Sequence, residues 1–190
     1  MNTKVNKTSH STNGVLYNTP LASIKDGNLL SSDGTVVHSD NIDRTFLAAI
    51  RRLMEEQSIT VKQLSELMYA DKDTLDTNFK LYRGFTYSKA SVLCVILVDG
   101  KRFNSLEEVT AYGEESINKF YDKLIQTFEV RGLTYMLAEE LSGVSHSTLY
   151  CYKNKKKKPH LKNAVILSAA LKFDLSFDFF RIVNKGDKNE

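Results

Sequence analysis

The residues best suited to chemistry lie together in one short stretch, 145–158. Its outward-facing positions carry side chains that can hydrogen-bond or stack, namely Ser145, His146, Ser147, Tyr150, Cys151 and Asn154. A run of ammonium groups follows, on Lys155, Lys156, Lys157 and Lys158. Hydroxyl, imidazole, phenol and amide groups can pair with the polar edges of bases, and ammonium groups attract phosphates. These residue types suit a groove that lies between two walls of phosphates.

Two helices joined by a tight turn must position these residues. Gly143 follows Ser142 at the turn, and glycine adopts backbone angles that other residues avoid. Ser145 is a good N-cap for the second helix, because its hydroxyl can accept from an amide of the first turn. Thr134 and Tyr135, at the start of the first helix, are assigned to the same outward surface. The apolar positions have helical spacing and are expected to face a shared core, and they are Ala138, Leu141, Val144, Leu149 and Tyr152.

This stretch resembles the helix-turn-helix of the lambda-repressor-like regulators, the Cro and repressor family. The residues that carry the resemblance, within 116–182, are Gly143-Val144-Ser145, Tyr152, Lys158-Pro159 and the apolar segment Leu161–Leu171. Two positions depart from the family pattern. Glu139 stands where a small residue is usual, with Ala138 one place before it, and Ser142 replaces an apolar residue. The resemblance implies an all-α fold, binding to double-stranded DNA, and dimers on half-sites about one turn of DNA apart.

The positive charge is concentrated in the same part of the chain. Residues 1–41 contain three Lys and three Asp, which sum to zero, and residues 42–115 contain ten Lys or Arg against twelve Asp or Glu, a sum of −2. Residues 116–190 contain thirteen against eight, a sum of +5. This is the sign that a surface for nucleic acid requires.

The chain also contains a weak internal repeat, whose copies are offset by 74 in residue number. A shift of this size without any gap brings apolar positions into coincidence over most of the two segments. We therefore predict two copies of one four-helix module, at 42–115 and 116–182. Pairs that coincide include Phe46 with Phe120, Ile50 with Leu124, Thr60 with Thr134, Leu75 with Leu149 and Leu97 with Leu171.

The two copies differ at the positions expected to bind DNA. The outward face of the first copy carries Asp71, Lys72, Asp73, Asp76, Thr77 and Lys80. Carboxylates are repelled by phosphates and by the acceptors on base edges. The lysine run is replaced by a segment with three aromatic residues, Tyr82, Phe85 and Tyr87, and exposed aromatic side chains are typical of protein interfaces. We predict that the first copy makes protein contacts, through a dimer or another partner.

The two ends of the chain are polar. Residues 1–41 are rich in Ser, Thr, Asn and Gly, and the short apolar stretches Val15–Tyr17, Leu29–Leu30 and Val36–Val37 can form strands joined by turns. This segment is either a polar tail or a small β-arm that docks on the body or on a partner. Residues 183–190 are predicted to be a polar tail.

Several functional classes find no support in the sequence. No apolar run approaches the roughly 20 residues that cross a bilayer, and the longest, Ser91–Val98, is expected to be a buried helix. The polar N-terminus and the lack of a predicted disulfide between Cys94 and Cys151 favour a reducing, cytoplasmic location. The spacing of His146, Cys151 and His160 matches no usual zinc site. No glycine loop for phosphates and no nucleophile elbow is present, so we expect no enzyme and no cofactor.

These observations predict an all-α protein with two lambda-repressor-like modules in tandem and a polar N-terminal arm. The predicted function is sequence-specific binding to double-stranded DNA by the second module, as a transcriptional regulator, a repressor of phage or mobile-element type. A homodimer is expected, although a tandem chain can instead place both modules on one site. The alternative is a protein-binding inhibitor or adaptor, for example a phage-encoded inhibitor of a host protein, that uses the same fold for protein contacts.

Overall fold

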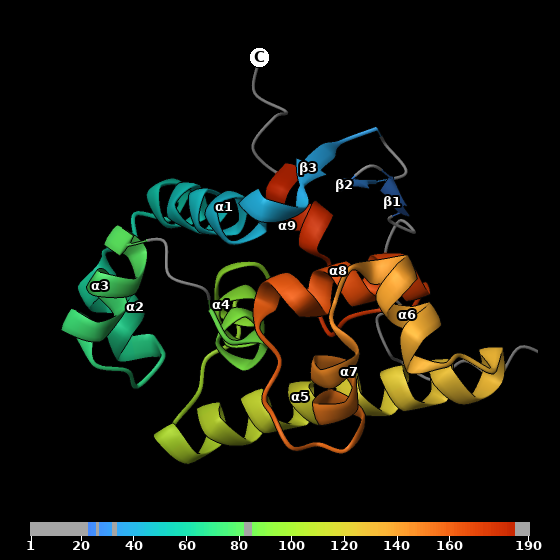
Figure 1. The fold of residues 1–190 in the computed structure, drawn as a ribbon. Coiled ribbons are helices and arrows are strands. Elements are labelled where there is room, and N and C mark those ends of the chain that lie inside the picture. The colour runs from blue at the N-terminus through green and yellow to red at the C-terminus, as the bar shows by residue number, and fades with distance from the viewer. Residues whose placement is uncertain (1–22, 26, 32–33, 82–84, 185–190) are drawn as a thin grey trace, which may run out of the picture.

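The computed structural model describes residues 23–25, 27–31, 34–81 and 85–184. These residues form a mainly helical protein with a small three-stranded antiparallel sheet, which confirms the predicted helical class (Figure 1). The elements are β1 (Ser23–Lys25), β2 (Asn28–Leu30), β3 (Val36–His38), the 3-10 turn η1 (Ser39–Asn41), α1 (Ile42–Glu56), α2 (Val61–Leu67), α3 (Lys72–Leu81), α4 (Tyr87–Leu97), α5 (Leu106–Arg131), α6 (Tyr135–Ser142), α7 (His146–Lys153), α8 (Leu161–Leu171) and α9 (Phe179–Asn184).

Helix positions follow the offset of the sequence repeat. Helices α2, α3 and α4 begin at 61, 72 and 87, and α6, α7 and α8 begin at the equivalent positions of the second copy, 135, 146 and 161. Residues 116–130, the counterpart of α1, lie within α5. The apolar run of the sequence forms α4, whose side chains from Ala90 to Leu97 are all buried. The spacing between the starts of these helices is thus the same in both halves of the chain.

The turns between helices also correspond. Ser58 and Gly132 both adopt left-handed backbone angles, with φ of 54° and 59°, after the first helix of each half. Tyr69 and Gly143, which are equivalent positions of the repeat, have φ of 50° and 69°. The second half places glycine, which tolerates these angles, where the first half places side chains.

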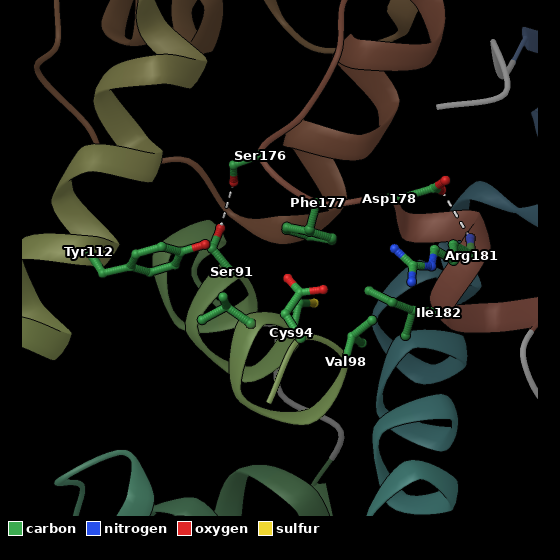
Figure 2. Close-up of a pocket in the computed structure, with 11 residues that line it drawn as sticks. Ser91, Cys94, Val98, Tyr112, Ser176, Phe177, Asp178, Arg181 and Ile182 are labelled. Atoms are coloured by element: carbon green, nitrogen blue, oxygen red, sulfur yellow. Dashed lines mark hydrogen bonds between the residues drawn. The ribbon is translucent and has the colours of Figure 1, made fainter. Parts of the chain in front are cut away.

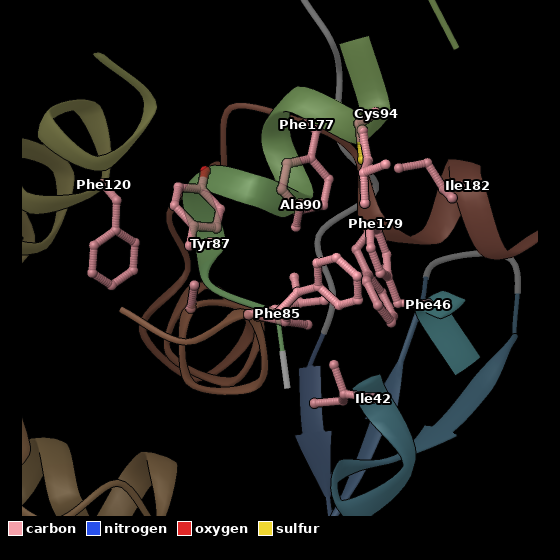
Figure 3. Close-up of a cluster of buried hydrophobic side chains, with 14 of the residues drawn as sticks. Ile42, Phe46, Phe85, Tyr87, Ala90, Cys94, Phe120, Phe177, Phe179 and Ile182 are labelled. Carbon is pink, nitrogen blue, oxygen red and sulfur yellow. The ribbon is translucent and has the colours of Figure 1, made fainter. Parts of the chain in front are cut away.

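The two halves share one hydrophobic core. Figure 3 shows Phe46 and Tyr87, from the first half, in the same cluster as Phe120 and Phe177, from the second. The ring centroid of Tyr87 lies 5.6 Å from that of Phe120 and 5.6 Å from that of Phe177. The predicted boundary between residues 115 and 116 falls inside α5, a single helix. The two copies are therefore not separate domains, because a continuous helix and a common core join them.

The described part of the N-terminal arm forms a β-arm docked on the helices. β2 pairs with β1 and β3, and Leu29 lies opposite Val37, where both side chains are buried. β1 packs on α8 and β3 packs on α1, so the arm covers both halves. Val15–Tyr17 lie outside the described residues. At the other end, 183 and 184 belong to α9 rather than to a tail, and Arg52 donates to the carbonyl of Val183 at 3.0 Å.

Candidate nucleic-acid interface

Helix α6 meets the core with its small residues. Ala138 and Ser142 are buried, whereas Leu141 is 40% exposed, so the prediction that Leu141 faces the core is wrong. The Ser142 hydroxyl donates to the carbonyl of Ala138 at 2.6 Å and accepts from the amide of Val144 at 3.1 Å. These bonds satisfy the buried hydroxyl, so its burial carries little penalty. The small side chains let α6 pack closely on α8.

Polar caps fix both ends of the α6–α7 turn. The Thr134 hydroxyl caps α6 by accepting from the amide of Leu137 at 3.1 Å, and Gly143 ends the helix with its left-handed angles. The Ser145 hydroxyl accepts from the amide of Thr148 at 3.4 Å, which confirms it as the N-cap of α7. Thr134 and Ser145 thus have structural roles in addition to being exposed.

A carboxylate from α6 also binds the start of α7. Glu139 accepts from the backbone amide of His146 at 3.1 Å, and it lies 2.9 Å from Nδ1 of the same imidazole. The hydrogen bond from the His146 side chain, followed by that from its amide, lowers the pKa of Glu139. This contact gives Glu139 a structural role at the start of α7. It leaves Nε2 of His146 as the ring nitrogen available to a ligand.

The outward face of α7 centres on Tyr150. Its side chain is 46% exposed, and its ring meets that of Tyr135 edge to face with the centroids 6.0 Å apart. Tyr135 is itself half-buried against Phe128, so it supports Tyr150 more than it offers a free surface. Tyr152 points the opposite way and is fully buried, as predicted. Ser147 is exposed beside Ser145, and their hydroxyl oxygens are 3.2 Å apart.

Two residues predicted to contact DNA, Cys151 and Asn154, are less available to a ligand than the sequence indicates. Cys151 is only partly exposed. Asn154 ends α7, and its side-chain amide donates to the carbonyl of Tyr150 at 2.8 Å. One donor of Asn154 is therefore already used within the protein.

The lysine run forms the loop after α7, and part of it is paired with α5. Lys155 lies 3.2 Å from a carboxylate oxygen of Asp122, and Lys158 is paired with Glu114. The Tyr121 hydroxyl, also on α5, donates to the carbonyl of Lys157 at 2.8 Å and anchors the loop. No local pattern reveals these partners, because Asp122 and Glu114 precede their lysines by 33 and 44 residues.

The other two lysines remain available. The Lys156 ammonium lies 5.0 Å from the ring centroid of Tyr150, which places a positive charge beside the centre of the α7 face. The Lys157 ammonium is exposed and, among the described residues, has no side-chain partner. These two residues are the best placed of the four to bind phosphates.

The corresponding helix of the first half, α3, carries the opposite charge. Asp71 caps it, accepting from the amide of Thr74 at 2.7 Å. The hydrogen bond from the Thr74 side chain, followed by that from its amide, lowers the pKa of Asp71. Asp76 forms an ion pair with Lys80 at 2.5 Å, while Asp73 is exposed. The acidic residues thus occupy the face that the sequence predicts.

The aromatic interface predicted for the first half is wrong for two of its three residues. Phe85 and Tyr87 are buried, at 2% and 0% exposure. The Phe85 ring packs on Phe46 and Phe79 of the first half, and the Tyr87 ring packs on Phe120 and Phe177 of the second. The Tyr87 hydroxyl lies 2.8 Å from the hydroxyl of Ser176 and accepts from the amide of that residue, and burial raises its pKa to about 12. Tyr82 lies outside the described residues.

One small cavity lies between α4, α5 and the segment before α9 (Figure 2). Ser91 and Ser176, 3.1 Å apart, line it together with Cys94 and Asp178. Its volume of about 20 Å³ suits a single water molecule rather than an organic ligand. Burial raises the pKa of the Cys94 thiol well above its ordinary value, so this cysteine is not an activated nucleophile.

Among the described residues, no cluster of three His, Cys, Asp or Glu side chains has the arrangement of a metal site. Within the same ranges, no helix combines the length and the apolar character that crossing a bilayer requires. Comparison of the chain with protein-family models, with curated proteins and with solved structures found no match.

Proposed function

We propose that the chain is a sequence-specific regulator of transcription, most simply a repressor of phage or mobile-element type, that binds double-stranded DNA through α6 and α7. One observation carries the proposal. A short helix, capped at Ser145, presents the exposed side chains of His146, Ser147 and Tyr150 beside the two available lysines, 156 and 157. Donors and acceptors on such a helix can read base edges in the major groove, while the ammonium groups hold the phosphates.

We infer further that α2–α4 and α6–α8 are two helix-turn-helix units of one kind. The equal helix starts, the left-handed turns at Tyr69 and Gly143, and the matching caps at Thr60 and Thr134 support this inference. Only the second unit has the charge that DNA requires. In this proposal α7 is the recognition helix, and α3 is the equivalent helix of the first unit, which makes no contacts with DNA.

The test is binding to genomic DNA fragments, including the region upstream of the chain's own coding sequence, followed by substitution of α7. Tyr150→Ala is expected to weaken the selected site by about 1–3 kcal/mol, the range for one good base contact, and to weaken random DNA much less. Asp76→Ala changes the equivalent position of α3 and is the matched control, which should leave both affinities unchanged. Equal loss on selected and random DNA would show that Tyr150 does not read sequence.

A second candidate function, binding to a protein target, is favoured by one surface. Val130 and Met136 are each 79% exposed, and Leu137 is 41% exposed, at the end of α5 and on α6. The equivalent residues of the first half are polar: Glu56, Lys62 and Gln63. Exposed apolar side chains that gather in a patch mark interaction sites. An inhibitor or adaptor would use this surface, and Met136→Lys would then abolish binding to the protein target.

A further inference from the structure

The two halves are joined by a backbone contact at equivalent positions. Thr86 and His160 form an isolated antiparallel bridge, and their separation in the chain equals the offset of the repeat. The amide of Tyr87 donates to the carbonyl of Pro159 at 2.9 Å, and the amide of Leu161 donates to the carbonyl of Phe85 at 2.9 Å. The two bonds are equivalent under the repeat, because Tyr87 corresponds to Leu161 and Pro159 corresponds to Phe85.

A pair of bonds that exchange in this way defines a local two-fold axis. The axis passes between Thr86 and His160, which are the N-caps of α4 and α8. The packing agrees with it: α4 packs on α5, and α8 packs on α1, whose equivalent lies in α5. Within each half, Gln57 donates to the carbonyl of Leu97 at 2.6 Å, and Arg131 donates to that of Leu171 at 2.8 Å.

The residues on both sides of this axis are buried, and the backbone groups at the bridge have hydrogen-bond partners. Phe85 and Tyr87 of one half, and Phe120 and Leu161 of the other, are at most 2% exposed. The four backbone groups at the bridge are paired with each other. Neither half therefore offers this surface to a second chain.

We propose that a single chain is the two-fold unit that occupies one DNA site, with the first half in the place of a second subunit. This proposal rests on the proposed function. It assigns Tyr87 of the first half a partner, which is the second half of the same chain. It also makes the complex asymmetric. Helix α7 reads one side of the site, whereas Asp73 and Asp76 of α3 stand where α7 has Ser147 and Tyr150, and they cannot pair with base acceptors.

The first experiment measures mass by light scattering on the full chain, free and bound to a short duplex containing the selected site. We expect 21.5 kDa for the free protein and one chain per duplex in the complex. A mass of twice that value, either free or on DNA, would overturn the proposal. Base changes on the side read by α7 should lower affinity tenfold or more, and changes on the other side should lower it less than threefold. Equal sensitivity of the two sides would contradict the asymmetric mode.

The second experiment tests the axis itself. Thr86 and His160 form a pair without mutual hydrogen bonds, since those bonds flank them, and the Cα atoms of such antiparallel pairs approach about 4.5 Å, close enough for a disulfide. The double variant Thr86→Cys, His160→Cys is expected to oxidise within one chain and to run as a monomer under non-reducing conditions. The unsubstituted chain, with Cys94 and Cys151, is the control for background cross-linking.

The outcomes separate the two proposals. Disulfide-linked dimers of the double variant would show that the halves pair between chains, and would overturn the single-chain unit. Absence of binding to any DNA fragment would overturn the proposed function, and occupancy of a DNA site with it. The mass of the free protein and the intramolecular cross-link would still decide whether one chain contains the two-fold unit.

Discussion

At the scale of residues, the four lysines of 155–158 differ in their surroundings although they are identical in sequence. Lys155 and Lys158 are paired with carboxylates of α5, and Lys156 and Lys157 are not. Exposed ion pairs contribute little to stability, but each carboxylate offsets positive charge that would otherwise act on a phosphate. The four lysines are alike in sequence, but in the structure two of them are paired with carboxylates and two are not.

The salt dependence of DNA binding should reveal this division. If Lys156 and Lys157 each contact a phosphate, the double variant Lys156→Ala, Lys157→Ala lowers the slope of log K against log salt by about 1.8, or 0.9 per contact. The matched double variant Lys155→Ala, Lys158→Ala should change the slope by less than half as much. Titrations at four or more salt concentrations measure both slopes, and equal changes would contradict the assignment.

At the scale of elements, the two halves build the same turns from different residues. Gly132 ends α5 with φ of 59°, and a Cβ added there would meet no atom within 4 Å. Ser58 adopts nearly the same angle at the end of α1. The difference between these two turns is therefore one of backbone strain rather than of packing.

Exchange of residues between these turns measures the strain. Gly132→Ala should destabilise the protein by about 1 kcal/mol, because the left-handed region costs an L-residue about 1–2 kcal/mol and part of this is regained in the unfolded chain. Ser58→Gly is the reverse change and should stabilise by no more than about 1 kcal/mol. Urea unfolding followed by circular dichroism gives both values. A Gly132→Ala variant as stable as the parent would show that the turn relaxes.

The α2 and α6 helices show how side-chain size changes packing at equal backbone positions. The buried positions Ala138 and Ser142 of α6 correspond to Leu64 and Met68 of α2, which are larger. A groove of about 250 Å³ lies between the end of α2, α4 and α5, and Met68 and Val92 are among the residues that line it. The first half thus has the same helices, but this groove lies between the end of α2 and α4, whereas α6 packs closely on α8 in the second half.

At the scale of the whole molecule, the halves depend on each other. Helix α5 runs through the division between them, and Tyr87 packs on Phe120 across it. Separation would expose Tyr87 on one fragment and Phe120 and Phe177 on the other. Burial of each large apolar side chain contributes about 1.5–3 kcal/mol, which is a substantial part of the stability of a small domain.

We therefore expect neither 1–115 nor 116–190 to fold alone. Each fragment should lack a cooperative thermal transition and dispersed amide signals in NMR spectra, whereas the full chain should unfold in one transition. Mixing the two fragments is the matched control, because folding on mixing would show that both are competent. A cooperative transition in 116–190 by itself would contradict the dependence.

The sequence alone was enough to predict the N-cap at Ser145, the turn at Gly143 and the offset of the internal repeat. These features are local, since periodicity, capping and glycine angles act within a few residues. The repeat could be detected because both halves keep the same spacing between helix starts.

Packing between distant segments sets which side chains are available to a partner. Phe85 and Tyr87 were expected on the surface and are buried, because Phe46 and Phe79 pack on Phe85 and the second half packs on Tyr87. Leu141 was expected in the core and is exposed, because α6 packs on α8 through its small residues, Ala138 and Ser142. Two of the four lysines are paired with carboxylates 33 and 44 residues away. Each outcome depends on packing between segments distant in the chain, and no local pattern of residues encodes that packing.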